Sequence, residues 1–367
     1  MTAADAARAA CEAAWQARGF VPLGLLFDLA AATAPGAIGP RARALCLSYN
    51  GAMAAQDRIR AAAAWGDEAA ADIAGWMAQA GLAERPAQRL SADRIATLEA
   101  ALIADPAGYV AAADRPYPLS EGGSNLGFDA GWTAARLSAG QDRLAAFVAG
   151  RRSDTAVLLG NGPSLNAVDL SLLRGRDVYI SNYAMRHPAL RRLARGVAVT
   201  NLMVAEQAPF VFHDTPLWSF HPVWMGHVIP DRARTVWLNA VGGPLFFGAP
   251  VTRAIAWHAT VSFFWLQILY HAGYRRVLMA GFDNSYVQPK GIREGVVLHQ
   301  TAPDPNHFDP RYFQGKTWQA ADTDHMAATY ALARQHYEAD GRVILNCTAG
   351  GRLEVFDRQD LATALAG

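Results

Sequence analysis

The chain has 367 residues, of which 52% are hydrophobic, and a formal net charge of +1. This length exceeds that of one typical domain, so we expect two domains and enough apolar residues for a large core. The near-neutral charge gives no indication of a nucleic-acid partner.

The cysteine content and the apolar runs predict a cytoplasmic protein. Cys11, Cys46 and Cys347 are the three cysteines, an odd and sparse set that does not suit a disulfide framework. The N-terminus lacks the basic and apolar pattern of a signal peptide. The longest apolar run, residues 261–270, is far shorter than the ~20 residues of a membrane span. We therefore expect no transmembrane segment and at most an association with a membrane surface.

The first third of the chain is predicted to be helical. Apolar residues recur there at three- and four-residue spacing, as in Ile73, Trp76, Met77 and Ala80. Residues 105–131 are rich in proline, glycine, serine and aspartate, which is typical of a linker. We assign residues 1–125 to an all-helical accessory domain with its linker, and residues 126–367 to a second domain.

The second domain alternates between predicted strands and helices. Strands are expected at 156–159, 177–182, 196–204, 276–283 and 342–347, and helices at 132–148, 165–173, 188–195, 253–272 and 324–340. This alternation predicts an α/β fold in which helices cover both faces of a parallel sheet. Ligands bind such sheets at the carboxyl ends of the strands, near the switch in strand order.

A glycine-rich turn follows the first predicted strand, with the sequence Gly160-Asn161-Gly162-Pro163-Ser164. Glycine permits a sharp turn and a close approach to a ligand, and proline suits the first position of a helix. The free amides and the dipole of such a helix start favour an anion, usually phosphate. The spacing is neither GxGxxG nor a P-loop. The alternative is an ordinary strand–turn–helix corner with a capping serine.

Polar side chains lie at or just beyond the ends of several predicted strands. They are Asn161, Ser164, Asn182, Asn201, Asp283 and Thr348. Because the carboxyl ends of parallel strands meet at one edge of the sheet, we expect these side chains to converge on one pocket.

Two irregular regions interrupt the alternation. Residues 207–252 are rich in aromatic residues and contain His213, His221 and His227. These histidines lack the short paired spacing that zinc sites favour, so we interpret the region as a lid or an acceptor-side surface. Residues 285–321 are long for a loop in a compact domain and are also expected to form a functional lid.

Several segments of the second domain resemble known glycosyltransferases. Residues 160–165, 181–182, 201, 206–207, 259–262 and 272–283 resemble bacterial sialyltransferases in order and context. Those enzymes are metal-independent, use CMP-activated sugars and have one Rossmann-like nucleotide domain. Residues 306–313, 315–318 and 346–356 look more like the motility-associated-factor flagellin glycosyltransferases, whose relatives resemble archaeal 6-hydroxymethylpterin diphosphokinase. The resemblance covers residues 126–358.

The resemblance implies a donor site and a general base. With the pocket residues above, the donor site comprises Gly160, Asn161, Gly162, Ser164, Asn182, Asn201, Thr260, Ser262, Asp283, Tyr286, Tyr312 and Thr348. The glycine turn would hold the donor phosphate and sugar, and the asparagines of the next two strands would hold the ribose and donor. Thr260 and Ser262 would line the nucleotide pocket, and Tyr286 would bond the phosphate. In sialyltransferases a second phosphate-binding tyrosine follows closely, whereas here the next is Tyr312. His307 would be the general base, with His299 as the alternative.

This interpretation requires no metal and no cofactor, because the CMP-sugar is a substrate. Backbone amides, a tyrosine hydroxyl and a helix dipole can stabilise a single departing phosphate. A histidine suits removal of the proton from the hydroxyl of a glycan or protein acceptor. We expect a direct, inverting displacement without a covalent intermediate.

Two other functions stay open at this stage. Pyrophosphoryl transfer from ATP to a pterin needs Mg²⁺ and carboxylates, for which Asp283 with Asp304 or Asp309 are candidates. Asp322-Thr323-Asp324 also resembles a metal-binding DxD motif, but it precedes a helix, where capping is favoured. The other possibility is a non-catalytic nucleotide-binding module whose helical half recruits a partner.

Overall fold

The computed structural model describes residues 2–18, 32, 130–208, 210–213, 215–226, 228–241, 245–292 and 296–367. Helix α1 (Ala3–Arg18) belongs to the expected helical accessory domain. The rest of that domain and the expected linker lie outside the described residues, apart from residue 32. The second domain accounts for nearly all of the architecture that follows.

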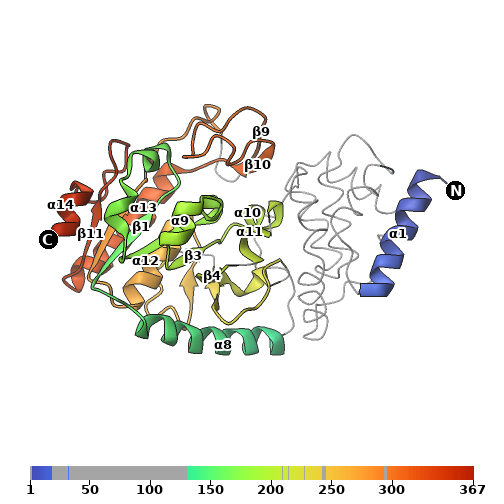
Figure 1. Ribbon diagram of the computed structural model, residues 1–367, viewed down its shortest axis with the longest axis horizontal. Helices are drawn as coiled ribbons and strands as arrows, with labels where there is room; N and C mark the ends of the chain where they lie inside the picture. Colours follow the sequence, from blue (N-terminus) through green and yellow to red (C-terminus); the bar gives the residue numbers. More distant parts are fainter. Residues whose placement is uncertain are drawn as a thin grey trace.

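A parallel sheet of seven strands, in the order β11-β8-β1-β2-β3-β4-β5, forms the centre of this domain (Figure 1). The strands are β1 (Thr155–Leu159), β2 (Asp177–Ser181), β3 (Gly196–Ala198), β4 (Trp218–Pro222), β5 (Thr235–Leu238), β8 (Arg276–Ala280) and β11 (Val343–Asn346). Consecutive apolar residues form these strands because helices bury both faces of the sheet. The predicted α/β fold with a Rossmann-like parallel sheet is therefore confirmed for the described residues.

Helices and short 3₁₀ segments cover the sheet on both sides. The helices are α8 (Ala130–Ala149), α9 (Pro188–Leu193), α10 (Leu202–Gln207), α11 (Phe210–His213), α12 (Val261–His271), α13 (Thr323–Ala339) and α14 (Leu361–Ala366). The 3₁₀ segments are η2 (Pro163–Ala167), η3 (Leu170–Leu173), η4 (Asn182–Arg186) and η5 (Val223–Met225). Neighbouring residues of β1 belong to different cores: Val157 faces the core under η2–η4, and Leu158 faces the core under α8, α12 and α13.

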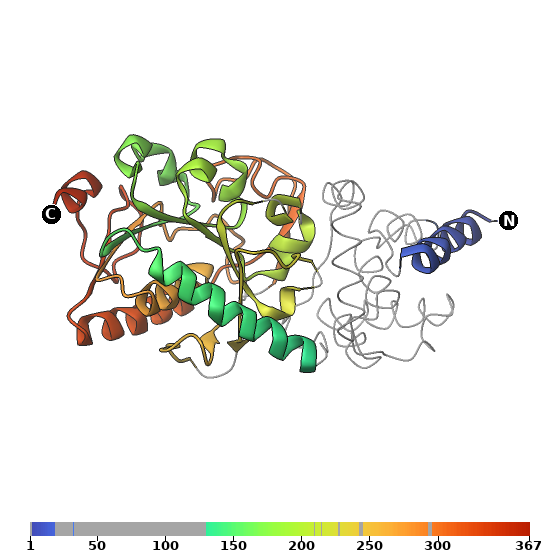
Figure 2. The same ribbon diagram turned by 60° about the horizontal axis from the view of Figure 1, so that its bottom comes forward.

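Helix α8 lies against the edge strand β5, and Figure 2 shows it crossing the front of the molecule. A Cβ atom at Gly140 would collide with the backbone of Trp237, so this glycine permits the close approach of the helix to the strand. The helix thereby covers a sheet edge that would otherwise be open. Within the described part of the chain, no helix combines the length and the apolar character that crossing a bilayer needs.

The structure corrects three of the predicted elements. The expected α-helix at 165–173 is a pair of short 3₁₀ segments, η2 and η3. The expected strand at 196–204 ends at Ala198, because Asn201 caps α10 and accepts a hydrogen bond from the amide of Met203 at 2.9 Å. The expected helix at 253–272 begins only at Val261, where Thr260 is the N-cap, and is preceded by strand β7 (Ile255–Ala256), which pairs with β6 (Ala240–Val241).

The two irregular regions have different structures. Residues 207–252 contain β4 and the edge strand β5 of the central sheet, so their interpretation as a lid is wrong. Several aromatic residues of this region are buried, among them Phe220 of β4 and Trp237 of β5. Residues 285–321 instead form an excursion that contains the antiparallel strands β9 (Val297–Gln300) and β10 (Lys316–Gln319).

The strand order places a topological switch point at β1. From β1 the chain builds the sheet outward through β2, β3, β4 and β5, and it then crosses back to place β8 on the other side of β1. The loops that leave β1 and β8 therefore lie side by side at the carboxyl edge of the sheet. Crevices at such points are the usual ligand sites of open α/β sheets.

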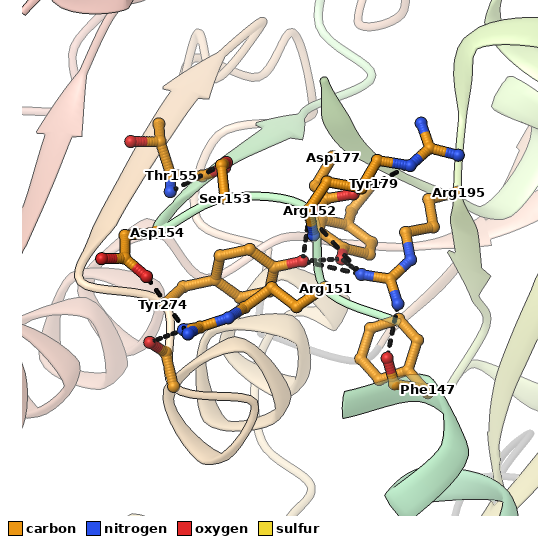
Figure 3. Close-up of polar contacts among 11 residues, drawn as sticks. Phe147, Arg151, Arg152, Ser153, Asp154, Thr155, Asp177, Tyr179, Arg195 and Tyr274 are labelled. Atoms are coloured by element: carbon orange, nitrogen blue, oxygen red, sulfur yellow. Dashed lines mark hydrogen bonds and ion pairs between the residues drawn. The ribbon is translucent and has the colours of Figure 1, made fainter. Parts of the chain in front are cut away.

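A buried charge network lies at the opposite edge, where β2 begins (Figure 3). The fully buried carboxylate of Asp177 accepts hydrogen bonds from the hydroxyl of Tyr274 at 2.8 Å and from the backbone amide of Arg152 at 2.9 Å. The guanidinium of Arg195 lies 3.5 Å from it. Burial raises the pKa of the Tyr274 and Tyr179 hydroxyls, so both stay protonated. The network joins the starts of four strands, β1, β2, β3 and β8, far from the switch point.

Replacement of Asp177 by alanine is expected to lower the free energy of unfolding by about 3–5 kcal/mol, because it leaves the buried Arg195 charge uncompensated. Urea unfolding measures this loss. The matched control is Arg152→Ala, which keeps the backbone donor and removes a side chain that is 60% exposed; its expected effect is below about 1 kcal/mol. Equal losses in the two variants would contradict the role assigned to the carboxylate.

Candidate functional site

Two contiguous cavities open at the carboxyl edge of the sheet. The first, which we call the switch-point cavity, has a volume of about 120 Å³ and is lined by the loops after β1 and β8, the start of α12 and part of the 285–321 excursion. The second, the side cavity, has a volume of about 490 Å³ and is lined by the residues after β3, the segment before α12 and the start of α13. Asn182, Thr260, Val261, Tyr286 and His307 line both cavities.

Most of the residues that the sequence indicates meet here. The switch-point cavity is lined by Gly160, Asn161, Gly162, Asn182, Thr260, Ser262, Asp283, Tyr286 and His307. Asn201 lines the side cavity. Ser164, Tyr312 and Thr348 are not among the lining residues of either cavity, and His299 is exposed on β9. The expected convergence of polar residues from separate strands is therefore found for most of them. Tyr312 lies beneath His307, and Ser164 and Thr348 line a separate cavity of about 520 Å³.

The glycine turn is held by hydrogen bonds to the loop that follows β8. The amide of Gly162 donates to the carbonyl of Gly281 at 3.0 Å. The amide and hydroxyl of Ser164 donate to Oδ2 of Asp283 at 3.2 and 2.7 Å. Because η2 is a 3₁₀ helix of five residues, the predicted helix dipole at this turn is wrong. The carboxylate of Asp283 therefore occupies the position at which the sequence predicts an anionic ligand.

The glycines of the turn permit the contact between the loops after β1 and β8. A Cβ atom at Gly160 would collide with the carbonyl of Gly281, and one at Gly162 would collide with the carboxylate of Asp283. Thr348 supports the second loop from behind, where its hydroxyl accepts a hydrogen bond from the amide of Phe282 at 3.0 Å.

Two buried carboxamide oxygens at this site have no hydrogen-bond partner among the residues that the structure describes. They are the Oδ1 atoms of Asn161 and Asn182, and both residues line the switch-point cavity. Asn182 also has a positive φ of 51°, an uncommon conformation that is frequent at functional sites. An unpaired buried acceptor costs about 1–3 kcal/mol. A ligand that donates hydrogen bonds from N–H or O–H groups would remove this cost.

Hydroxyl groups cluster at the start of α12. Thr260 caps this helix of 11 residues and its hydroxyl lies 3.3 Å from that of Ser262. Tyr286 and Tyr330 line the same cavity from the excursion and from α13. Burial raises the pKa of both phenols; for Tyr286 the neighbouring Tyr330 and Asp283 add to the shift. Both phenols therefore stay protonated and can donate hydrogen bonds to a ligand.

His307 lies where the two cavities meet. Its Nδ1 atom is 2.8 Å from Oδ2 of Asp304, and its ring stacks on Tyr312 with a centroid distance of 4.0 Å. The ring of Phe313 contacts it edge-on at 5.1 Å. Tyr312 is thus a support beneath the histidine, and its hydroxyl accepts a hydrogen bond from the amide of Tyr183 at 3.2 Å.

The carboxylates considered for Mg²⁺ are each engaged elsewhere. Asp283 binds the glycine turn, Asp304 binds His307, and Asp309 forms an ion pair with Arg311 at 3.0 Å. Asp322 accepts hydrogen bonds from the amides of residues 324 and 325, so its predicted capping role is confirmed. Among the described residues, no group of three or more histidine, cysteine or acidic side chains is arranged to hold a metal ion. Neither lysine nor arginine is among the described residues that line the two cavities.

Two of the three histidines of the 207–252 region are core residues. Nε2 of His213 lies 3.1 Å from the carbonyl of Val228, and His221 contacts Ser219 and lies 3.3 Å from the carbonyl of Val199. Burial lowers the pKa of His213 to about 4 and that of His221 to about 3, and the backbone contacts oppose it only partly. His227 lies outside the described residues.

Sequence patterns missed several residues of the site. The sequence indicates Asp304 only as a candidate metal ligand, gives Asn306 no role beyond its place in the 306–313 resemblance, and gives no signal for Tyr330, although Asn306 and Tyr330 line the switch-point cavity. Tyr330 lies within α13, where the regular pattern of a helix does not distinguish it as a site residue. The Asp-Pro-Asn-His spacing of residues 304–307 was the one local signal for the carboxylate beside the histidine.

Comparison of the chain with protein-family models, with curated proteins and with solved structures gives no significant match.

The buried histidines predict a loss of stability on acidification. Below pH 6.5 the unfolded chain takes up protons, whereas folded His213 and His221 do so only near pH 4 and 3. The free energy of unfolding should therefore fall between pH 6.5 and pH 4, by up to roughly 1.4 kcal/mol per pH unit for each histidine. Urea unfolding across this range measures the slope. His221→Asn should flatten it and the exposed control His299→Asn should not; an unchanged slope in His221→Asn would contradict this assignment.

Proposed function

We propose that the chain is a glycosyltransferase that transfers a sialic-acid-like (nonulosonate) sugar from a CMP-activated donor to a hydroxyl of a glycan or protein, with His307 as the general base. The observation that carries this proposal is the place of His307, at the junction of two contiguous cavities beside the switch point of a parallel sheet. A transfer between two substrates needs both of them against the same catalytic group. A histidine at such a junction meets that requirement.

The chemistry of the lining supports a donor with one phosphate. Hydroxyls of Thr260, Ser262, Tyr286 and Tyr330 gather at the N-terminus of α12, where the helix dipole favours an anion. The lining described above contains neither lysine nor arginine. Neutral donors and one helix end suit a single phosphate better than a triphosphate, which requires Mg²⁺ or cationic side chains. The phosphate accordingly belongs at α12 in this proposal, and the glycine turn serves as scaffold.

The unpaired asparagine oxygens support a sugar or nucleoside beside that phosphate. Oδ1 of Asn161 and Oδ1 of Asn182 are free to accept hydrogen bonds from a ligand. Ribose hydroxyls, sugar hydroxyls and the amino group of cytosine are all hydrogen-bond donors. Asn201, whose Nδ2 atom donates to Oε1 of Gln319 at 2.8 Å, holds the wall of the side cavity.

The reaction is a displacement at the anomeric carbon of the donor. The acceptor oxygen forms the new bond, the bond between the anomeric carbon and the phosphate oxygen breaks, and its electron pair leaves with CMP. His307 takes the proton of the acceptor hydroxyl as the new bond forms. The α12 hydroxyls stabilise the negative charge on the departing phosphate.

CMP is expected to stabilise the protein against heat in the presence of EDTA. At a concentration of one hundred times its Kd, a ligand adds about 2.7 kcal/mol to the free energy of unfolding, which corresponds to a rise in Tm of roughly 5–10 °C for a domain of this size. Differential scanning fluorimetry measures the shift, with cytidine and ATP plus MgCl₂ as comparisons. Stabilisation by ATP with Mg²⁺ alone would instead favour the pyrophosphokinase, and the sugar-transfer proposal would fail.

His307→Ala should keep the affinity for CMP within about twofold and lower turnover by roughly 10²–10⁴, the usual contribution of a general base. Release of CMP from CMP-sialic acid, with a glycan acceptor, measures turnover. His299→Ala tests the other histidine and should retain activity, because that residue is exposed on β9. Loss of activity in His299→Ala with full activity in His307→Ala would exchange the two assignments.

A further inference from the structure

Asp304 is a buried carboxylate whose two oxygens both accept hydrogen bonds. Its side chain is only 2% exposed. Oδ2 accepts a hydrogen bond from the amide of Phe313 at 3.2 Å and lies 2.8 Å from Nδ1 of His307, and Oδ1 accepts from the amide of Asn306 at 2.9 Å. Because a backbone amide donates to each of the two oxygens, the side chain is held in its ionised form, which only accepts hydrogen bonds.

This arrangement fixes which nitrogen of His307 carries the proton. A carboxylate only accepts hydrogen bonds, so Nδ1 is the protonated nitrogen in the neutral ring and Nε2 keeps its lone pair. The stacked ring of Tyr312 and the edge contact with Phe313 hold the imidazole plane in place. With Nδ1 directed at Asp304, Nε2 is the atom left to accept a proton from a substrate.

We propose that Asp304 is the positioning residue for His307: its carboxylate holds the tautomer in which Nε2 is the base and compensates the positive charge of the imidazolium. This inference rests on the proposed function. In the transfer step the proton of the acceptor hydroxyl moves to Nε2, and the resulting imidazolium donates Nδ1–H to Asp304. The proton passes to solvent after the product leaves, which restores the neutral ring.

Other titratable groups face His307 from the elements around it. Tyr312 lies beneath the ring, and Tyr286 and Asp283 line the switch-point cavity, where the carboxylate of Asp283 is bound by Ser164. Across the side cavity are His258, Asp322 and His325. Among the described residues, Asp304 is the carboxylate in hydrogen-bond contact with the imidazole.

The decisive variant is Asp304→Asn. An asparagine cannot satisfy all three partners: with its NH₂ group toward Asn306 it faces a second donor, and with its NH₂ group toward His307 it forces the proton from Nδ1 to Nε2. We expect kcat to fall about 10²–10⁴-fold, the range seen when such a carboxylate is replaced by its amide, with the Kd for CMP changed less than twofold. The acid limb of the pH–rate profile should move to lower pH, because the imidazolium loses its counter-charge.

Asp304→Glu and Asp309→Asn are the matched controls. The first keeps a carboxylate near the ring, so it should recover at least tenfold of the lost kcat and move the acid limb back up toward that of the unsubstituted chain. The second removes the carboxylate that pairs with exposed Arg311 in the same segment and should leave kcat unchanged. A normal kcat and an unshifted acid limb in Asp304→Asn would overturn the proposal.

A measurement on the unsubstituted chain needs neither turnover nor a stable variant. ¹⁵N chemical shifts of the histidine side chains, with His307 identified by its absence in His307→Gln, report the tautomer directly. We expect Nδ1–H and an unprotonated Nε2 at pH 8, and the opposite tautomer would overturn the proposal even if CMP binds. If the expected tautomer is found but CMP is neither bound nor released from CMP-sialic acid, the proposed sugar transfer fails and the positioning of His307 by Asp304 stands.

Discussion

The parallel pairing of β1 with β8 is the contact on which the rest of the site depends. It brings together two strands more than a hundred residues apart in the chain and leaves their loops side by side at the carboxyl edge. The amide of Gly162 then reaches the carbonyl of Gly281, and Ser164 reaches Asp283. These contacts need glycine at positions 160 and 162, since any side chain would collide with the opposite loop. The switch-point cavity is the space that remains above them.

The excursion of residues 285–321 completes the cavity by binding to both sides of it. The amide of Phe308 donates to the carbonyl of Asn161 at 2.9 Å, and Nδ2 of Asn166 donates back to the carbonyl of Phe308 at 2.9 Å. On the other side, Gln207 accepts from the amide of Thr317 at 2.8 Å. His307 is thus carried by a loop, but that loop is attached to the scaffold after β1 and after β3, which gives its side chain a defined place.

Stability and candidate function lie at opposite edges of the sheet. The network of Asp177 with Arg195 and Tyr274 holds the amino edge through buried charges. The carboxyl edge has neutral hydroxyls, unpaired carboxamide oxygens and a histidine beside a buried carboxylate. Unpaired buried acceptors lower the stability of the free protein. A ligand that donates hydrogen bonds to them at the switch point would remove this cost. The proposed donor, a sugar with a single phosphate, would therefore bind at the carboxyl edge and not at the amino edge.

The sequence by itself determined the parts of this protein whose signals are local. Runs of apolar residues identified β1, β2, β8 and β11, Asp322 marked the start of α13, and polar residues after the strands identified the edge at which the site lies. The tertiary structure decided everything that depends on distant partners. Residues 218–222 and 235–238 are strands of the sheet, although they lie in a region that the sequence predicts to be irregular. The glycine turn lost its expected anion because Asp283, 119 residues from Ser164, already fills the place. The periodicity of a helix or strand can be read from neighbouring residues in the sequence. A hydrogen bond between distant loops forms only after the strands that precede those loops have paired, so neighbouring residues do not reveal it.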